Sequence, residues 1–189
     1  MSLPSYRELS KMIDHSLLKP SMVEAELDAG CRLALEYDVA SVCTMPYYLE
    51  RAARLLAGSD VLPTTTIGFP HGGHSARIKR LEAEQALADG ARELDMVVNV
   101  SQVLSGNFAA VRSEIAGVLQ PTRDAGAKLK VIFENCYLTD EHKVHLCEIC
   151  GELAVDWVKT STGFGSSGAT SGNAKSTETH SPGALITRG

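Results

Sequence analysis

Six short runs of β-forming residues alternate with stretches of helical periodicity along this 189-residue chain. The runs cover residues 12–18, 39–46, 62–70, 93–99, 128–135 and 156–162. Strand–helix alternation with short connections predicts parallel strands that are joined by right-handed crossovers. The chain is therefore expected to form an α/β fold in which helices cover a parallel sheet.

The starts of three helices can be read from capping patterns. Ser21 with Glu24 fits a capping box, in which each side chain satisfies a free backbone amide of the other residue. Asn107 and Thr139 precede two later apolar stripes at helical spacing, and both are plausible caps.

Two architectures fit this alternation: an open doubly wound sheet and a closed barrel. A sheet covered by helices on both faces should show near-continuous hydrophobic strands. Here, two runs have one apolar face and one face that carries ionisable groups. The apolar face holds Leu94, Met96, Val98, Leu129, Val131 and Phe133, and the other holds Asp95, Val97, Asn99, Lys130, Ile132 and Glu134. The pattern favours the barrel, here with about six βα units.

Composition narrows the classes of partner. With 44% hydrophobic and 22% charged residues the chain suits a globular domain, and a net charge of −5 with scattered basic residues argues against a nucleic-acid partner. No apolar stretch reaches the roughly 18 residues that cross a bilayer, so no membrane partner is expected. The N-terminal residues lack the apolar core of a secretory signal, which predicts a cytoplasmic protein. Five scattered cysteines are expected to be reduced.

The last 25 residues break the alternation. Between positions 165 and 189, 14 of the 25 residues are Gly, Ser or Thr, and the segment shows no strand or helix pattern. We expect a barrel-forming part at 1–164 and a flexible tail at 165–189.

Lys159 is the first candidate for chemistry, because it lies near the end of an apolar run. Burial would lower its pKa, and a neutral amine can attack a carbonyl to form a Schiff base. A second ammonium on Lys130, in the preceding run, would lower the pKa of Lys159 further. The alternative is a lysine at a strand end that reaches solvent.

Asp95 lies between apolar residues in the middle of a run, where aspartate is unfavourable. A buried carboxylate needs a partner, and a lysine inside the barrel is the obvious one. Asp14 repeats this pattern in the first run. The two residues could shuttle or orient protons, or could form structural ion pairs.

Three other patterns give weaker signals. His71 and His74 flank two glycines and are read as loop residues, although such a loop could bind a ligand. Cys147 and Cys150 follow two histidines, but helix geometry points these groups in different directions, so no metal site is expected. A Gly/Ser loop at 163–168 could cradle a phosphate.

Taken in order, six segments resemble the strands of deoxyribose-phosphate aldolases. They are residues 13–20, 41–46, 66–72, 93–99, 128–134 and 158–164, and the resemblance covers about 10 to 168. It implies a TIM barrel and a class I, metal-free and cofactor-free aldolase, a carbon–carbon lyase of nucleoside catabolism. Such an enzyme cleaves 2-deoxy-D-ribose 5-phosphate, a small phosphorylated sugar, to acetaldehyde and D-glyceraldehyde 3-phosphate. A homo-oligomer is compatible with it.

The resemblance also implies roles for individual residues. Lys159 matches the Schiff-base lysine, Asp95 the proton-relay aspartate, and Lys130 the lysine thought to lower the pKa of the nucleophile. Four more positions match residues that line the site or bind substrate: Asp14, Cys43, Thr160 and Gly163.

The chain departs from the family after the sixth run. A TIM barrel has eight strands, and neither the strand-7 lysine motif nor the Gly-Ser phosphate segment after strand 8 can be matched here. We therefore expect open edges at the first and sixth strands, poor stability unless another chain closes the barrel, weak phosphate binding and reduced activity. A catalytically silent partial barrel that acts as a binding or regulatory subunit, and a Schiff-base enzyme for unphosphorylated aldehydes, are the alternatives.

Overall fold

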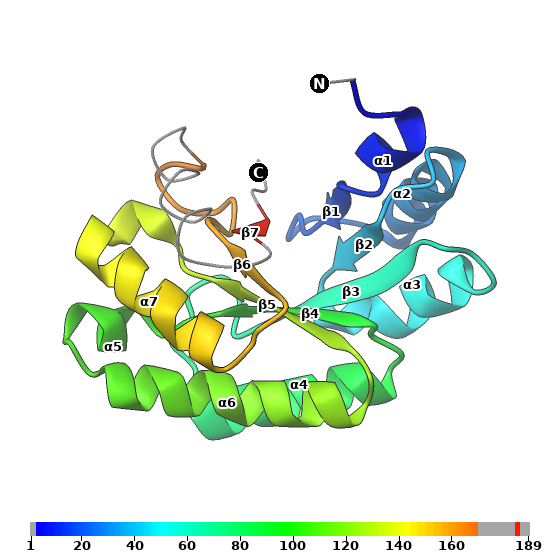
Figure 1. Cartoon of the computed structure of the whole chain (residues 1–189). Coiled ribbons are helices and arrows are strands. Elements are labelled where there is room, and N and C mark those ends of the chain that lie inside the picture. The colour runs from blue at the N-terminus through cyan, green and yellow to red at the C-terminus, as the bar shows by residue number, and fades with distance from the viewer. Residues whose placement is uncertain (1–2, 170–183, 186–189) are drawn as a thin grey trace.

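A computed structural model describes residues 3–169 and 184–185 of the chain. One curved sheet of parallel strands forms a half-barrel, and helices cover its convex side (Figure 1). The strands are β1 (Asp14–Leu17), β2 (Ser41–Thr44), β3 (Leu62–Ile67), β4 (Glu93–Val97), β5 (Lys128–Ile132), β6 (Trp157–Lys159) and β7 (Ala184–Leu185). The α-helices are α1 (Tyr6–Ser10), α2 (Glu24–Glu36), α3 (Leu49–Leu56), α4 (Ala76–Ala88), α5 (Val100–Leu104), α6 (Phe108–Asp124) and α7 (Asp140–Glu152), and the short 3₁₀ helices are η1 (Pro46–Tyr48) and η2 (Asn135–Tyr137).

The strand order settles the choice between the two architectures. The strands lie in chain order from β1 to β7, and every neighbouring pair is parallel. A doubly wound sheet reverses its order at a switch point, and the described strands show no reversal. The predicted barrel-type fold of about six βα units is therefore confirmed, as a half-barrel that β1 and β7 leave open within the described residues.

The apolar faces predicted for β4 and β5 do pack under helices. Leu94, Met96, Leu129 and Val131 are fully buried in one cluster together with Ile115 of α6. A second, smaller cluster lies between β1, β2, α2 and α3, and it consists of Leu17, Met22, Leu27, Cys31, Ala34, Val39, Val42, Ala52, Leu56 and Val61. Among the described residues, no helix combines the length and apolar character needed to cross a membrane.

Two of the three predicted caps are correct in position. The Thr139 hydroxyl accepts from the His142 amide at the start of α7, and Asn107 occupies the N-cap of α6 without a side-chain bond to that helix. The Ser21–Glu24 capping box was wrong. The Met22 amide donates to the Lys19 carbonyl in a turn, α2 begins at Glu24, and the side chain of Glu26, not that of Glu24, accepts from the Val23 amide ahead of the helix.

The expected tail contains an element that its composition did not predict. The two residues of β7 pair in parallel with Val158 and Lys159, so β6 is not the open edge that we expected. An unpaired strand edge offers backbone donors and acceptors to any extended segment, whatever its composition. Residues 170–183 and 186–189 of the predicted flexible tail lie outside the described residues.

The buried helix face of α6 provides a direct test of this core. Replacing the fully buried Ile115 by Ala is expected to lower the free energy of unfolding by about 2–5 kcal/mol, because the lost methylenes leave a cavity. Ile78 on α4 is 46% exposed, so Ile78→Ala should change it by less than about 1 kcal/mol. Urea unfolding of both variants measures this, and equal losses would contradict the assigned core.

Candidate active site

Lys159 and Asp95 form an ion pair inside the half-barrel. Lys159 ends β6 and Asp95 is the middle residue of β4, and their Nζ and Oδ2 atoms lie 2.7 Å apart. The side chains are only 7% and 0% exposed, respectively. Lys159 therefore does not reach solvent as a strand-end lysine would, and the partner predicted for Asp95 is present.

Lys130 of β5 contacts the other oxygen of the same carboxylate. Its Nζ lies 3.3 Å from Asp95 Oδ1 and 3.4 Å from Asp14 Oδ2, and it also forms an ion pair with Glu93. Asp95 consequently bridges two ammonium groups, one through each oxygen. The predicted pairing of the Lys130 strand with the Lys159 strand is confirmed by the β5–β6 register, in which Ile132 lies opposite Lys159.

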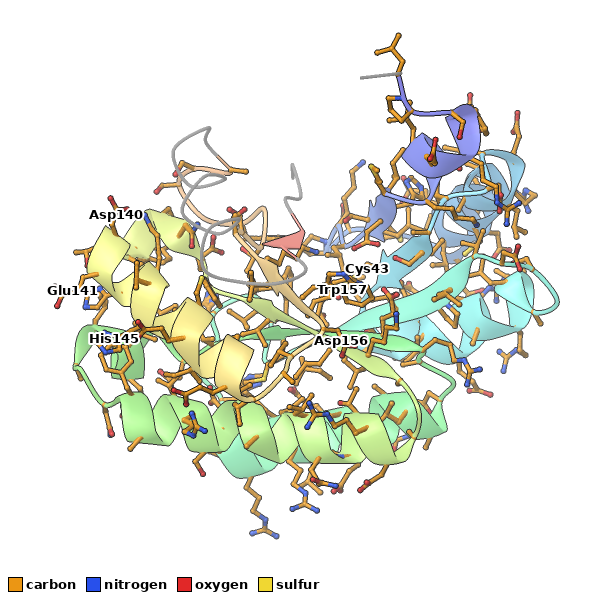
Figure 2. The ribbon with its side chains drawn as sticks, viewed as in Figure 1. Cys43, Asp140, Glu141, His145, Asp156 and Trp157 are labelled. Carbon is orange, nitrogen blue, oxygen red and sulfur yellow. The ribbon has the colours of Figure 1, made fainter. Side chains whose placement is uncertain are left out.

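Neighbouring strands complete the polar cluster. Ser41 Oγ donates to Asp14 Oδ1 at 2.6 Å, and Cys43 Sγ lies 3.9 Å from Asp95 Oδ2. The Trp157 ring lies over Lys130, with its centroid 5.3 Å from Nζ, which suits a cation–π contact. Figure 2 labels Cys43 and Trp157, which lie within the curve of the sheet.

The pKa of Lys159 differs from the sequence-based expectation. Burial lowers the pKa of this ammonium, as expected, but the Asp95 carboxylate, with further contributions from Cys43 and Asp14, outweighs burial and raises the pKa above the usual lysine value. Burial likewise raises the pKa of the Asp95 carboxyl, and the charges of Lys130 and Lys159 together bring it below the usual value. The predicted lowering of the Lys159 pKa was therefore wrong, because these neighbours together outweigh the burial on which the prediction rested.

Lys130 was expected to repel the charge of Lys159. Burial alone would lower the pKa of Lys130, but the carboxylates of Asp95, Asp14 and Glu93 raise it. Its charge is thus matched by three acidic neighbours, and the pKa of Lys159 is raised although Lys130 lies in the same cluster. Burial raises the pKa of the Cys43 thiol, so this residue is a neutral neighbour of the cluster.

Thr160 and Gly163 lie in the loop that follows Lys159. The Thr160 carbonyl accepts from the Asn135 amide at 2.8 Å, and Gly163 has a φ of +86°, a backbone conformation that favours glycine. This places both residues beside the lysine at the carboxyl end of β6. Their predicted contact with substrate stays a prediction.

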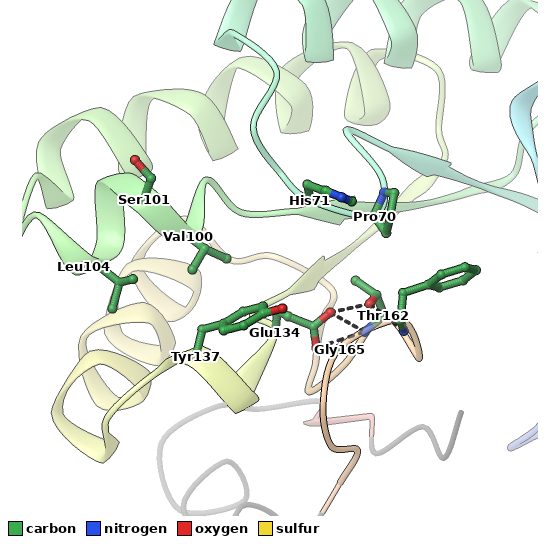
Figure 3. Close-up of a pocket in the computed structure, with 10 residues that line it drawn as sticks. Pro70, His71, Val100, Ser101, Leu104, Glu134, Tyr137, Thr162 and Gly165 are labelled. Atoms are coloured by element: carbon green, nitrogen blue, oxygen red, sulfur yellow. Dashed lines mark hydrogen bonds between the residues drawn. The ribbon is translucent and has the colours of Figure 1, made fainter.

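Glu134, which the sequence assigned to no role, holds this loop in place. Its side chain accepts hydrogen bonds from the hydroxyl and the amide of Thr162, the latter at 3.3 Å (Figure 3). A cavity of about 420 Å³ lies beside this contact, and its lining includes His71, Tyr137 and Phe164. The available signal for Glu134 was its position just after β5 on the polar face of that run, whereas its partner Thr162 lies in another loop, after β6.

A second cavity of about 430 Å³ lies beyond the carboxyl ends of β1, β2 and β3. Its lining includes Leu18, Met45, Phe69 and Phe164, and the two phenylalanine rings meet edge to face at 5.4 Å. Both cavities are bounded by loops at the end of the barrel where TIM-barrel active sites lie. Lys159 lines neither cavity, because its amine lies deeper, against Asp95.

The weaker sequence signals have structural explanations. His74 Nδ1 lies 3.2 Å from Glu82, and the His145 ring stacks on Phe108 at 4.5 Å. Cys147 and Cys150 are buried in the core, so the expected divergence from His145 is correct. Figure 2 shows His145 on the side of α7 away from the strands.

A buried lysine beside a carboxylate, inside a barrel of parallel strands, suits Schiff-base chemistry of the kind that class I aldolases carry out. The model of the DeoC/LacD family aldolases matches residues 9–184. A deoxyribose-phosphate aldolase of Rhodopirellula baltica is 61% identical over 176 residues, which are 93% of this chain and 73% of that protein. One of Brevibacillus brevis is 48% identical over 86% of this chain and 72% of the relative.

Solved structures agree with this result. A putative deoxyribose-phosphate aldolase from Coccidioides immitis superposes with a TM-score of 0.89 at 36% identity, and the match covers 94% of this chain and 69% of the other. The deoxyribose phosphate aldolase of Aeropyrum pernix, described as a unique tetramer, gives a TM-score of 0.85 at 29% identity over 94% and 74% of the two chains. The chain belongs to the DeoC/LacD aldolase family.

The bridging carboxylate should dominate the stability of this cluster. Asp95→Asn leaves two buried ammonium groups without their shared partner, and we expect a loss of about 3–5 kcal/mol near neutral pH. The Asp95 pKa is lowered on folding, so this stabilisation is present above the unfolded carboxyl pKa and is lost as the pH falls through the folded one. The pKa of Lys159 is raised on folding. Its contribution to the free energy of unfolding is therefore fully present below the lysine pKa of the unfolded chain and is lost as the pH rises through the pKa of the folded protein.

Chemical denaturation between acidic and alkaline pH measures this contribution. The exposed pair of Arg54 and Glu50 is a suitable control, because Glu50→Gln should have little effect at any pH. A variant at Asp95 that is as stable as the parent protein would show that the bridge is not a stabilising feature.

Proposed function

We propose that this chain is a class I deoxyribose-phosphate aldolase that works through a Schiff base on Lys159. The reaction is the reversible cleavage of 2-deoxy-D-ribose 5-phosphate to acetaldehyde and D-glyceraldehyde 3-phosphate. The observation that carries the proposal is the buried contact between Lys159 and Asp95, in a chain whose relatives bear this name. The silent partial barrel is not favoured, because the lysine and its proton acceptor are both present and in contact.

The first chemical step needs a neutral amine. The ammonium first loses a proton to solvent, and Asp95 Oδ2, which lies 2.7 Å from Lys159 Nζ, can then take the proton that the nitrogen releases as the neutral amine attacks the C1 aldehyde. The resulting carbinolamine loses water with proton transfers through the same carboxyl group, and an iminium forms between Lys159 and C1. Asp95 is thus proposed to act first as a base and then as an acid.

Carbon–carbon cleavage follows from the electron demand of the iminium. Transfer of the C3 hydroxyl proton to the Asp95 carboxylate turns this oxygen into a carbonyl, the C2–C3 bond breaks, and its electron pair moves into the iminium to give an enamine. D-Glyceraldehyde 3-phosphate leaves at this point. The Asp95 carboxyl returns the proton to C2 of the enamine, and hydrolysis of the new iminium by water releases acetaldehyde and free Lys159.

The other residues of the cluster support this centre in the proposal. Lys130 keeps its charge and holds Asp95 through Oδ1, so that Oδ2 faces Lys159. Asp14 and Cys43 line the reacting end of the substrate, and Thr160 and Gly163 contact it from the loop after β6. The mechanism uses no cofactor or metal, and assembly into a homo-oligomer in the cytoplasm is part of the proposal.

Borohydride trapping tests the Schiff base. Incubation with 2-deoxy-D-ribose 5-phosphate followed by reduction should leave a covalent adduct that peptide mass spectrometry places on Lys159. Lys159→Leu should abolish the adduct and the turnover, by at least about a thousandfold, since the nucleophile is lost. Lys79, which is also buried but pairs with Glu114 on the helix side of the sheet, gives the matched control, and Lys79→Met should still be trapped.

The outcome of trapping separates the alternatives. An adduct with unphosphorylated aldehydes but none with the sugar phosphate would favour another Schiff-base enzyme. No adduct with either would favour the binding or regulatory subunit. An adduct that persists in Lys159→Leu would place the nucleophile elsewhere.

The pH dependence of imine formation follows from the raised pKa of Lys159. Below that pKa the neutral fraction of the amine grows about tenfold per pH unit, so the trapping rate should rise from about pH 6 to about pH 9 without a plateau. In Asp95→Asn, burial and Lys130 act without the opposing carboxylate, and the profile should move to lower pH. A plateau near neutral pH in the parent protein would contradict the raised pKa.

A further inference from the structure

Glu93 is a buried carboxylate of the cluster to which the proposed mechanism assigns no step. It begins β4, two residues before Asp95 and on the same face of the strand, and its side chain is 7% exposed. One of its oxygens, Oε2, forms an ion pair with Lys130 Nζ and lies 3.5 Å from Thr64 Oγ1. Glu93 thus contacts Lys130 from a position nearer the amino end of β4 than Asp95.

The charges of the cluster do not balance. Three carboxylates, on Asp14, Glu93 and Asp95, face two ammonium groups, on Lys130 and Lys159. Lys130 lies within ion-pair distance of all three carboxylates, whereas Lys159, among the residues that the structure describes, has such a contact with Asp95 alone. The proton acceptor of Lys159 is therefore shared with a lysine that has two other partners.

We propose that Glu93 is a positioning residue that holds the Lys130 ammonium on the amino-end side of the cluster and so leaves Asp95 Oδ2 to Lys159. This inference rests on the proposed function, since it concerns the same amine. Without the Glu93 charge, Lys130 is balanced only by Asp14 and Asp95, and its attraction for Asp95 grows. Asp95 then stabilises the Lys159 ammonium less.

Replacing Glu93 is predicted to speed imine formation, and the gain is predicted to depend on pH. Glu93→Gln removes a negative charge from the cluster, so the Lys159 ammonium loses its proton more easily and imine formation becomes faster. Burial raises the pKa of the Glu93 carboxyl, so the charge that Gln removes is fully present only above that raised pKa. The profiles of the two proteins should therefore coincide at low pH and diverge as the pH rises. If Glu93 only stabilised the folded protein, Glu93→Gln would instead be trapped more slowly at every pH.

Borohydride trapping with 2-deoxy-D-ribose 5-phosphate from about pH 6 to about pH 9 measures this. At the alkaline end, Glu93→Gln should be trapped about tenfold faster than the parent protein, which corresponds to one pH unit in the pKa of Lys159. Equal rates over the whole range, or slower trapping of the variant throughout, would overturn the inference while leaving the Schiff base itself established.

Glu114 provides the matched control. It is also a buried carboxylate paired with a buried lysine, at 2.9 Å from Lys79, but it lies on α6 outside the barrel. Glu114→Gln should lose stability and yet keep the parent pH profile of trapping. A profile that shifts in the same way in both variants would mean that loss of any buried charge produces the effect, and would overturn the assignment.

A second readout does not depend on turnover. In protein labelled with ¹³C at the lysine ε-carbon, the Lys159 resonance can be assigned by its loss in Lys159→Leu and followed against pH. Its titration should move to lower pH in Glu93→Gln. If the parent protein is never trapped, the proposed function fails, and an unmoved titration would separately overturn the role of Glu93.

Discussion

Asp95 is the residue on which the polar interior of this half-barrel depends. Each of its oxygens faces one buried lysine, and no part of its side chain is exposed. Two ammonium groups at this depth would repel one another and would be costly to bury without an anion between them. The bridge therefore explains how β4, β5 and β6 can present charged residues to the inside while their outer faces pack under helices as ordinary core.

This arrangement also couples stability to chemistry. The contact that holds the Lys159 ammonium in place raises its pKa, which opposes the loss of the proton that nucleophilic attack requires. The same contact puts a proton acceptor at hydrogen-bond distance. In the proposed mechanism, this carboxylate takes the proton that the nitrogen releases as the new bond to the substrate aldehyde forms.

Much of the fold was predictable because it rests on local periodicity. The outer faces of β4 and β5 are uniformly apolar while their inner faces carry ionisable groups, and that pattern alone favoured a barrel over a doubly wound sheet. The start of α2 was not predictable in the same way, because Ser21 lies in a turn between Lys19 and Met22 and Glu26 accepts from the backbone amide ahead of the helix. The pairing of β7 with β6 depends on a free strand edge, which no property of the segment 165–189 reveals.

The residues of the candidate site could be predicted from the sequence, but the direction of their pKa shifts could not. Alternation on β4 placed Asp95 inside, and the same alternation places Glu93 there, although Asp95 alone drew attention as a mid-strand carboxylate. The direction of the Lys159 pKa depends on which of its neighbours is nearest, and distances between strands are absent from a sequence. Burial and a neighbouring lysine argue for a lower pKa, while a carboxylate at 2.7 Å and further neighbours argue for a higher one, and here these neighbours together outweigh burial. The sequence therefore predicts which residues take part in the proposed chemistry, whereas the protonation state of Lys159 follows only from the packing of β1, β4, β5 and β6.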